Sequence, residues 1–255
     1  MKYLLYCIFR RQSEGPGEVP SAVDGSPVRF VEADGLCAAV SEIDCIDPSA
    51  HMSAAIAYHR VIESFHRRFT VIPFRFGTIL CEKAEIENVL RKKSRRYGEL
   101  LQELEGCDEM GIRILLNHAH EPAGTRPADE RSSSPGGACS GKAYLEARAS
   151  HYSIESLEEQ ANAARTARFC AVFHGMFTKF KSDISEPGLV SLYFLVPRDC
   201  LARFREAFAR MGPQEPDKIM LSGPWPPYNF VLPEDSRELT APLGETSEGL
   251  ECPIM

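Results

Sequence analysis

The order of the apolar segments after residue 106 restricts the fold of this chain more than any other feature of the sequence. Two segments there predict helices, a long one over residues 142–169 and a short one that Pro197 opens. Four short apolar segments predict strands, over residues 110–116, 173–180, 189–196 and 218–222. The resulting order, strand–helix–strand–strand–helix–strand, predicts a ferredoxin-like sandwich.

The first part of the chain contains the same kinds of element in another order. A buried strand is expected over Tyr3–Phe9, and the Asp34–Gly35 pair predicts the turn of a β-hairpin. Apolar residues at steps of three and four predict a helix over residues 51–69 and a second over 83–104, which Gly106 ends. The segment 71–79 between these helices predicts a strand, with Pro73 at an edge position or at its start.

We therefore expect an α+β protein with two domains, over residues 1–106 and 107–231. The polar stretch 118–141, which contains the letters RPADERSSSPGG, predicts a flexible loop within the second domain. Residues 232–255 are acidic and have no apolar period, which predicts an irregular tail.

Composition favours a cytoplasmic protein. The formal net charge of −7 argues against binding of nucleic acid through overall positive charge. No apolar run approaches the roughly 18–20 residues that a membrane span needs. The nine cysteines are odd in number and never occur as CxxC, so free thiols in a reducing compartment are expected rather than disulfides or a zinc knuckle.

Two patterns have a chemical interpretation, as a ligand or metal site, and a structural one. Residues 136–143, GGACSGKA, nearly match a phosphate-binding P-loop but lack the hydroxyl after the lysine and a preceding strand, which favours a lead into the long helix. His59, Glu63 and His66 share one helix face, as metal ligands do, but a histidine hydrogen-bonded at a helix–sheet boundary is the favoured interpretation. We assign no catalytic residue, metal or cofactor.

The segment from Arg60 to Arg96 holds ten Lys or Arg residues against four Glu. Such a concentration attracts an acidic partner or nucleic acid, whereas a solvated helix surface is the structural interpretation. The segment lacks the interleaved aromatic residues that stack on bases, so the solvated surface is favoured.

Two further segments are unusual. In VIPFRFGT, residues 71–78, aromatic rings alternate with a charged residue before a glycine. The guanidinium of Arg75 suits either a carboxylate of a partner or an internal bridge from strand to helix, and the internal bridge is the favoured interpretation.

In GPWPPYNF, residues 223–230, three prolines stiffen a segment that contains the only tryptophan. This second segment is expected to clamp the two domains together or to present Trp225 and Tyr228 to a partner.

These two segments resemble signatures of the gas vesicle GvpL/GvpF family. KYLLYCIF at the start, LCAAVSE after the hairpin and GKAYLEAR at the expected long helix support the resemblance, which covers about residues 2–231. The resemblance implies two α+β domains with a ferredoxin-like C-terminal half and no catalytic residues. The signature positions, which either contact a partner or hold the fold, are Arg75, Phe76, Gly77, Thr78, Gly223, Pro224, Trp225, Pro226, Pro227 and Tyr228.

The resemblance further implies a role in gas vesicle formation, through contact with the small hydrophobic shell protein and other accessory proteins, without nucleic acid or membrane as partner. Two other classes stay open from the residues alone. One is a metal- or nucleotide-dependent enzyme with its site between the domains. The other is a nucleic-acid-binding regulator that uses the Arg60–Arg96 region.

Overall fold

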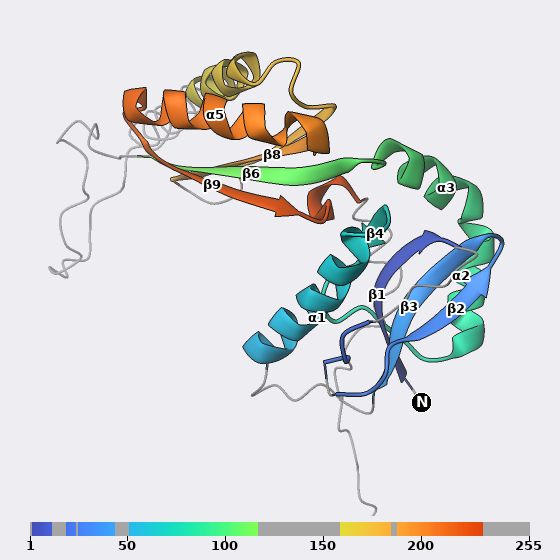
Figure 1. Cartoon of the computed structure of the whole chain (residues 1–255). Helices are drawn as coiled ribbons and strands as arrows, with labels where there is room; N and C mark the ends of the chain where they lie inside the picture. Colours follow the sequence, from blue (N-terminus) through green and yellow to red (C-terminus); the bar gives the residue numbers. More distant parts are fainter. Residues whose placement is uncertain are drawn as a thin grey trace, which may run out of the picture. The chain divides into compact units, whose positions relative to one another are not determined.

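The computed structural model of this protein describes residues 2–11, 19–23, 25–43, 51–116, 159–184 and 188–231. These residues form two compact units (Figure 1). The first unit contains the chain up to Glu109 together with the described residues from Gly223 onward, and the second contains Met110–Ser222. This division differs from the expected domain boundaries at residues 106 and 231, because the segment after Gly223 groups with the N-terminal part of the chain.

The first unit is built on an antiparallel sheet with β1 (Lys2–Arg10) at its centre. Its strands are ordered β2-β3-β1-β4, and β5 also pairs with β1. The remaining strands are β2 (Arg29–Ala33), β3 (Leu36–Ile43), β4 (Val71–Pro73) and β5 (Ile79–Leu80). The central strand is buried over most of its length, as its continuous apolar run predicts.

The hairpin and the proline position follow the sequence. Asp34 and Gly35 connect β2 to β3 with φ of 48° and 76°, the left-handed conformation that an Asp-Gly hairpin turn requires. Pro73 ends β4, which lies at an edge of the sheet, where a missing N–H costs no ladder hydrogen bond. Both predictions are confirmed.

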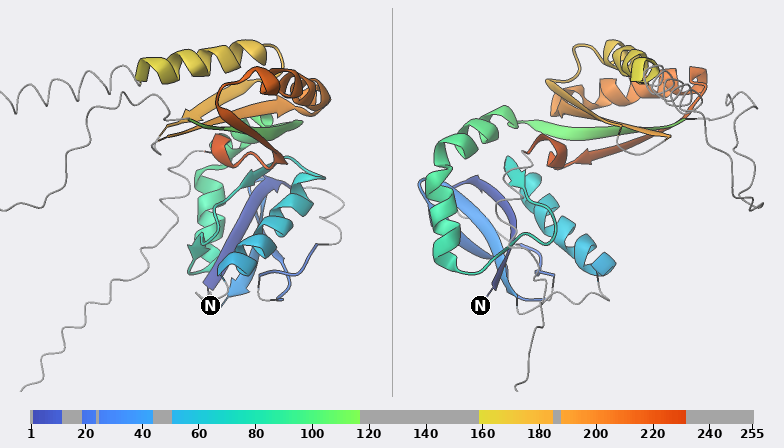
Figure 2. Two further views of the ribbon diagram at one scale, coloured as in Figure 1. Left: turned by 90° about the vertical axis from the view of Figure 1, so that its left-hand side faces the viewer. Right: turned by 180° about the vertical axis from the view of Figure 1, so that it is seen from behind.

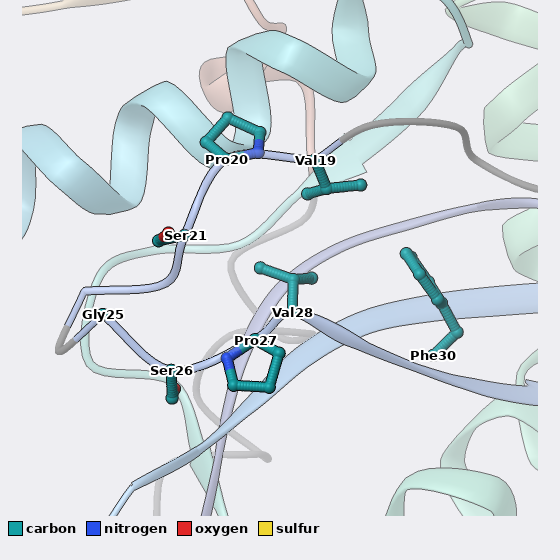
Figure 3. A pocket seen from close by; sticks show the side chains of 8 residues that line it. All are labelled: Val19, Pro20, Ser21, Gly25, Ser26, Pro27, Val28 and Phe30. Carbon is teal, nitrogen blue, oxygen red and sulfur yellow. The ribbon is translucent and has the colours of Figure 1, made fainter.

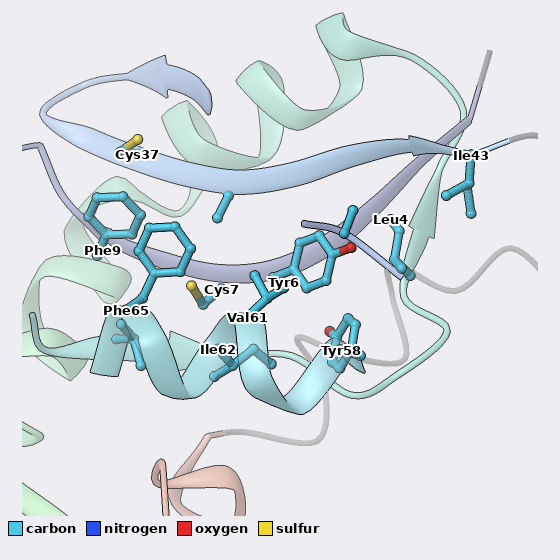
Figure 4. Close-up of a cluster of buried hydrophobic side chains, with 13 residues drawn as sticks. Leu4, Tyr6, Cys7, Phe9, Cys37, Ile43, Tyr58, Val61, Ile62 and Phe65 are labelled. Atoms are coloured by element: carbon cyan, nitrogen blue, oxygen red, sulfur yellow. The ribbon is translucent and has the colours of Figure 1, made fainter. Parts of the chain in front are cut away.

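Helices cover both faces of this sheet (Figure 2). Helix α1 (His51–His66) lies on one face, and its side chains Tyr58, Val61, Ile62 and Phe65 point into a core of side chains from β1 and β3 (Figure 4). Helices α2 (Lys83–Lys92) and α3 (Ser94–Glu103) lie on the other face. The single helix predicted over residues 83–104 is wrong in one respect, because the backbone at Lys93 leaves the helical region and divides it in two.

The second unit combines a four-stranded sheet with helices on one face, as Figure 1 shows. Its strands are ordered β7-β8-β6-β9. They are β6 (Cys107–Leu115), β7 (Lys179–Asp183), β8 (Leu189–Pro197) and β9 (Lys218–Trp225). The first three residues of β6 and the last three of β9 belong to the first unit. The helices are residues 159–172 and α5 (Leu201–Met211). Aromatic rings fill the core between them, and the rings of Phe173 and Phe204 stack at 4.1 Å.

One predicted strand begins later than expected. The apolar pattern predicts a strand that starts at Phe173, but the N–H of Phe173 still bonds to the carbonyl of Phe169 in the last turn of the helix. Gly175, with φ of 75°, follows as the left-handed residue that commonly ends a helix, and β7 begins only at Lys179. The predicted loop 118–141 and tail 232–255 lie outside the described residues.

The mixture of helices and antiparallel sheets confirms the α+β class. In the part of the chain that the structure describes, no helix is both long and apolar enough to cross a membrane.

Candidate functional site

The first of the two unusual segments forms the connection between β4 and β5. The N–H of Phe74 donates to the carbonyl of Tyr6 at 2.9 Å, and the carbonyl of Thr78 accepts from the N–H of Leu5 at 2.9 Å. The hydroxyl of Thr78 also donates to the carbonyl of Arg75 at 2.8 Å. The turn is therefore attached to β1 on both sides and closed across its own base.

Tyr58 on α1 holds this turn from the helix side. Its buried hydroxyl donates to the carbonyl of Leu5 at 2.6 Å and lies 3.1 Å from the carbonyls of Phe74 and Arg75. The ring of Phe76 packs edge-on against the Tyr58 ring with centroids 5.3 Å apart. Burial raises the pKa of Tyr58 well above its ordinary value, so the hydroxyl keeps the proton that it donates.

The expected internal bridge from the Arg75 side chain is wrong. The side chain is exposed, and within the described residues no carboxylate pairs with it. The carbonyl of Arg75 makes the internal contacts instead. A planar cation is costly to bury without a partner, so the turn uses backbone oxygen inside and leaves the charge in water.

Gly77 gives this turn a conformation that other residues rarely adopt, with φ of +90° and no atom within 4 Å of the place that a Cβ would occupy. We expect Gly77→Ala to lower the free energy of unfolding by about 1–2 kcal/mol through backbone strain alone. Gly98 lies inside α3, also with open space around it, so Gly98→Ala is expected to raise the same quantity by about 0.5–1 kcal/mol. Urea unfolding of both variants checks that the two changes in the free energy of unfolding have opposite signs. Equal changes would contradict backbone strain at residue 77.

The second unusual segment follows the Gly223–Pro224 peptide bond, which is cis. In the first unit this segment contacts α1 (Figure 1). The ring of Trp225 meets the His59 ring at 5.4 Å, and the Tyr228 hydroxyl lies 3.0 Å from Nδ1 of His59. Pro226 and Pro227 are buried, whereas Pro224 and Trp225 are exposed.

Glu109 fixes the end of this segment. One of its carboxylate oxygens accepts the backbone N–H of Asn229 at 2.8 Å, and the other accepts the Asn229 side-chain amide at 2.6 Å. The residue is 4% exposed, so both hydrogen bonds lie in a medium where charge-assisted bonds are strong. Phe230 and Val231 are buried just beyond this attachment.

The electrostatics determine which group donates between His59 and Tyr228. Burial lowers the pKa of His59, and burial raises the pKa of Tyr228, with further increases from Cys7, Glu109 and Glu63. A neutral imidazole and a protonated phenol therefore meet, and the phenol O–H donates to Nδ1.

This pair predicts a pH-dependent stability. The unfolded chain protonates His59 below a pH of about 6.5, whereas the folded chain does so only at lower pH, so the unfolded state binds more protons in between. The free energy of unfolding should fall as the pH decreases from about 6.5 through the folded pKa. In His59→Gln, whose amide oxygen still accepts from Tyr228, this part of the decrease should be absent when unfolding is measured from pH 8 to 5. Parallel curves for both proteins would contradict it.

The structure separates the three residues considered as metal ligands. His59 contacts Tyr228, Glu63 pairs with Arg67 at 2.8 Å, and His66 pairs with the buried Asp108 at 2.7 Å. Across the described ranges, no group of three or more His, Cys, Asp or Glu residues is arranged to hold a metal ion. The P-loop-like residues 136–143 lie outside those ranges.

A pocket of about 430 Å³ lies at the loop that precedes β2 (Figure 3). It is lined by Val19, Pro20, Ser21, Gly25, Ser26, Pro27, Val28 and Phe30. Among the described residues that line it, no side chain is ionisable, so these residues offer no group for acid–base chemistry.

The signature positions thus meet α1 at two consecutive residues. Tyr58 holds the turn at Arg75, Phe76, Gly77 and Thr78, and His59 holds the segment from Gly223 to Tyr228. Sequence reasoning missed Tyr58 and Glu109. A tyrosine in an apolar stripe gives only a weak signal for a buried hydroxyl, and an isolated glutamate gives none.

Comparison with known proteins gives consistent results. The family model described as gas vesicle synthesis protein GvpL/GvpF matches residues 2–232. Gas vesicle protein F of Haloferax mediterranei is 24% identical over 221 residues, which are 84% of this chain and 86% of that protein.

Two solved structures have a similar fold. The crystal structure of the gas vesicle protein GvpF from Microcystis aeruginosa gives a TM-score of 0.67 at 21% identity, covering 91% of this chain and 99% of that one. GvpF from Anabaena gives 0.64 at 20% identity, covering 91% and 96%. At these identities the likeness concerns the fold alone.

Proposed function

We propose that this chain, because it belongs to the gas vesicle synthesis protein GvpL/GvpF family, supports gas vesicle formation by binding the small hydrophobic shell protein. The observation that carries the proposal is the family match over residues 2–232, which includes both signature segments. Other accessory proteins of the vesicle are its further partners, and it acts in the cytoplasm and at the gas vesicle.

A physical reason favours this role. A shell protein with an exposed apolar face aggregates before it is assembled, unless another protein covers that face. A folded chain with apolar side chains at its surface provides such a cover without any chemical step. Met52, Ile56 and Trp225 are large apolar side chains of the first unit that are exposed.

We propose that the protein is not an enzyme. The ionisable residues beside the signature segments are engaged in structural hydrogen bonds, as in the pairs His59–Tyr228 and Glu109–Asn229. The thiols Cys7 and Cys37 have raised pKa values because of burial, to about 12 for Cys37, which disfavours the nucleophilic thiolate.

A nucleic-acid interface in the Arg60–Arg96 region has little support. Arg60 lies on α1, whereas Lys83, Arg91, Lys92, Arg95 and Arg96 lie on α2 and α3, which cover the opposite face of the sheet (Figure 2). Arg75 lies in the turn between β4 and β5. Several pair with glutamates one turn away, namely Arg67 with Glu63, Arg91 with Glu87 and Arg95 with Glu99. The cations therefore do not form one continuous positive surface.

The architecture proposed for this role has two folding domains, of which the second is ferredoxin-like. The element order β6, helix 159–172, β7, β8, α5, β9 supports the second part, as does the strand order β7-β8-β6-β9. We propose the ten signature positions as a partner-facing or fold-holding region, in which the exposed Arg75, Pro224 and Trp225 face the partner.

The test is a pull-down of the shell protein from cells that produce it together with the tagged chain. Retention of the shell protein, with or without other accessory proteins, is expected. A tagged protein of similar size and charge serves as the control for adhesion of an apolar protein to the resin. Retention no greater than in this control, under both conditions, would overturn the proposal.

A further inference from the structure

Helix α1 has an apolar face that the core of the first unit does not use. Tyr58, Ile62 and Phe65 point into the core, whereas Met52 is 75% exposed and Ile56 is 48% exposed. Single exposed apolar residues are common on protein surfaces and do not by themselves indicate a binding site. These two lie one turn apart on the same side of the helix, in line with His59.

Trp225 extends this apolar face from a distant part of the chain. Its ring contacts the ring of His59, which follows Ile56 by one turn, and it is 41% exposed. Three large apolar side chains therefore follow one another along about 10 Å of α1, which is two helical turns.

The tryptophan is held in place before any partner arrives. Tyr228 bonds to His59, Asn229 bonds to Glu109, and Phe230 is buried, so the segment behind the ring is fixed at several points. Binding through a side chain that is already ordered costs less conformational entropy than binding through a mobile one. Tryptophan in such a position is also among the residue types that contribute most to protein interfaces.

A positive charge borders this apolar row. Arg60 follows Ile56 by one turn and is exposed, and within the described residues no carboxylate pairs with it. The nearby Glu63 pairs with Arg67 instead. A partner that places a carboxylate beside its own apolar residues would complement this surface in both respects.

We infer that the surface formed by Met52, Ile56, Arg60 and Trp225 docks an amphipathic helix of the shell protein, with a carboxylate of that helix opposite Arg60. The inference rests on the proposed function for the identity of the partner. A helix of the partner fits because apolar residues at steps of three and four form a stripe along a helix. Two turns of such a stripe match the length of α1 along which the three apolar side chains lie.

The test compares surface variants with variants of equal chemistry elsewhere. Ile56→Asp, Trp225→Ala and Arg60→Glu are each expected to reduce at least tenfold the amount of shell protein retained per mole of this chain. Met220→Ser and Arg205→Glu change exposed residues of the second unit, with Met220 53% exposed, and are expected to retain it within twofold of the wild type. Circular dichroism and thermal unfolding identify any variant that fails to fold. If Ile56→Asp or Arg60→Glu does not fold, retention of the shell protein is measured with Ile56→Ser or Arg60→Ala in its place.

The outcomes separate the two proposals. Wild-type binding that survives all three surface changes overturns this surface and leaves the proposed function in place. Absence of wild-type binding overturns both. The charge contact has its own test, in which carboxylates of the shell protein are changed to lysine one at a time: one of these changes should restore binding to Arg60→Glu, and rescue by none of them would overturn the charge contact.

Discussion

Phe65→Ala is expected to lower the free energy of unfolding of the first unit by about 3–5 kcal/mol. Phe65 is fully buried on α1, and its ring lies 5.3 Å from the Phe9 ring and 5.9 Å from the Phe30 ring. The substitution removes a side chain that joins α1 to both β1 and β2, and it leaves a cavity that a close-packed core refills only in part.

Urea unfolding followed by tryptophan fluorescence measures this effect, because the only tryptophan, Trp225, belongs to the first unit. Arg60→Ala on the same helix is the control, since Arg60 is exposed and should change the free energy by less than about 0.5 kcal/mol. A loss below about 1 kcal/mol for Phe65→Ala would mean that α1 is not attached to the sheet through this face.

Local patterns predicted the elements whose structure has a local cause. The turn at Asp34 and Gly35 follows from residue type alone, and α1 follows from its apolar repeat. The break at Lys93 has no such sign, because neither glycine nor proline marks it and the hydrogen bond from Lys93 to Val89 continues across it. The late start of β7 has a similar origin, since Phe173 is apolar enough for a strand but packs on the helix side.

The site was predicted as two separate segments, and the structure adds what joins each of them to the fold. The hydrogen bond between His59 and Tyr228 spans 169 positions in the chain, a separation at which sequence pattern gives no pairing. Segment composition indicated that Trp225 and Tyr228 were unusual, but only the fold brings both rings to the same histidine. The interior role of the Arg75 backbone, in place of its side chain, is likewise a property of the folded turn.

Two adjacent residues of α1 therefore connect the core to the surface. Tyr58 lies on the side of the helix that faces β1, and its neighbour His59 lies beside the segment that carries Trp225. A helix that is rigidly packed on one side transmits that rigidity to the groups on its other side. Anchoring of Trp225 should then depend on contacts that are distant from the ring itself, among them the two hydrogen bonds that Asn229 donates to Glu109.

Glu109→Ala is accordingly expected to lower the free energy of unfolding of the first unit by about 3 kcal/mol, because two hydrogen bonds to a buried charge are lost and the Asn229 N–H is left without its acceptor. Urea unfolding measures the loss. Acrylamide should also quench Trp225 more strongly, since the segment behind the ring is no longer held.

Glu109→Gln is the matched control for this change. The amide has almost the same size and keeps one acceptor oxygen, so it should retain one of the two bonds to Asn229 and lose about half as much stability. If Glu109→Ala leaves both the unfolding curve and the quenching of Trp225 as in the wild type, the carboxylate does not anchor the segment. Trp225 would then be mobile, and the low entropic cost of binding that its fixed position implies would be lost with it.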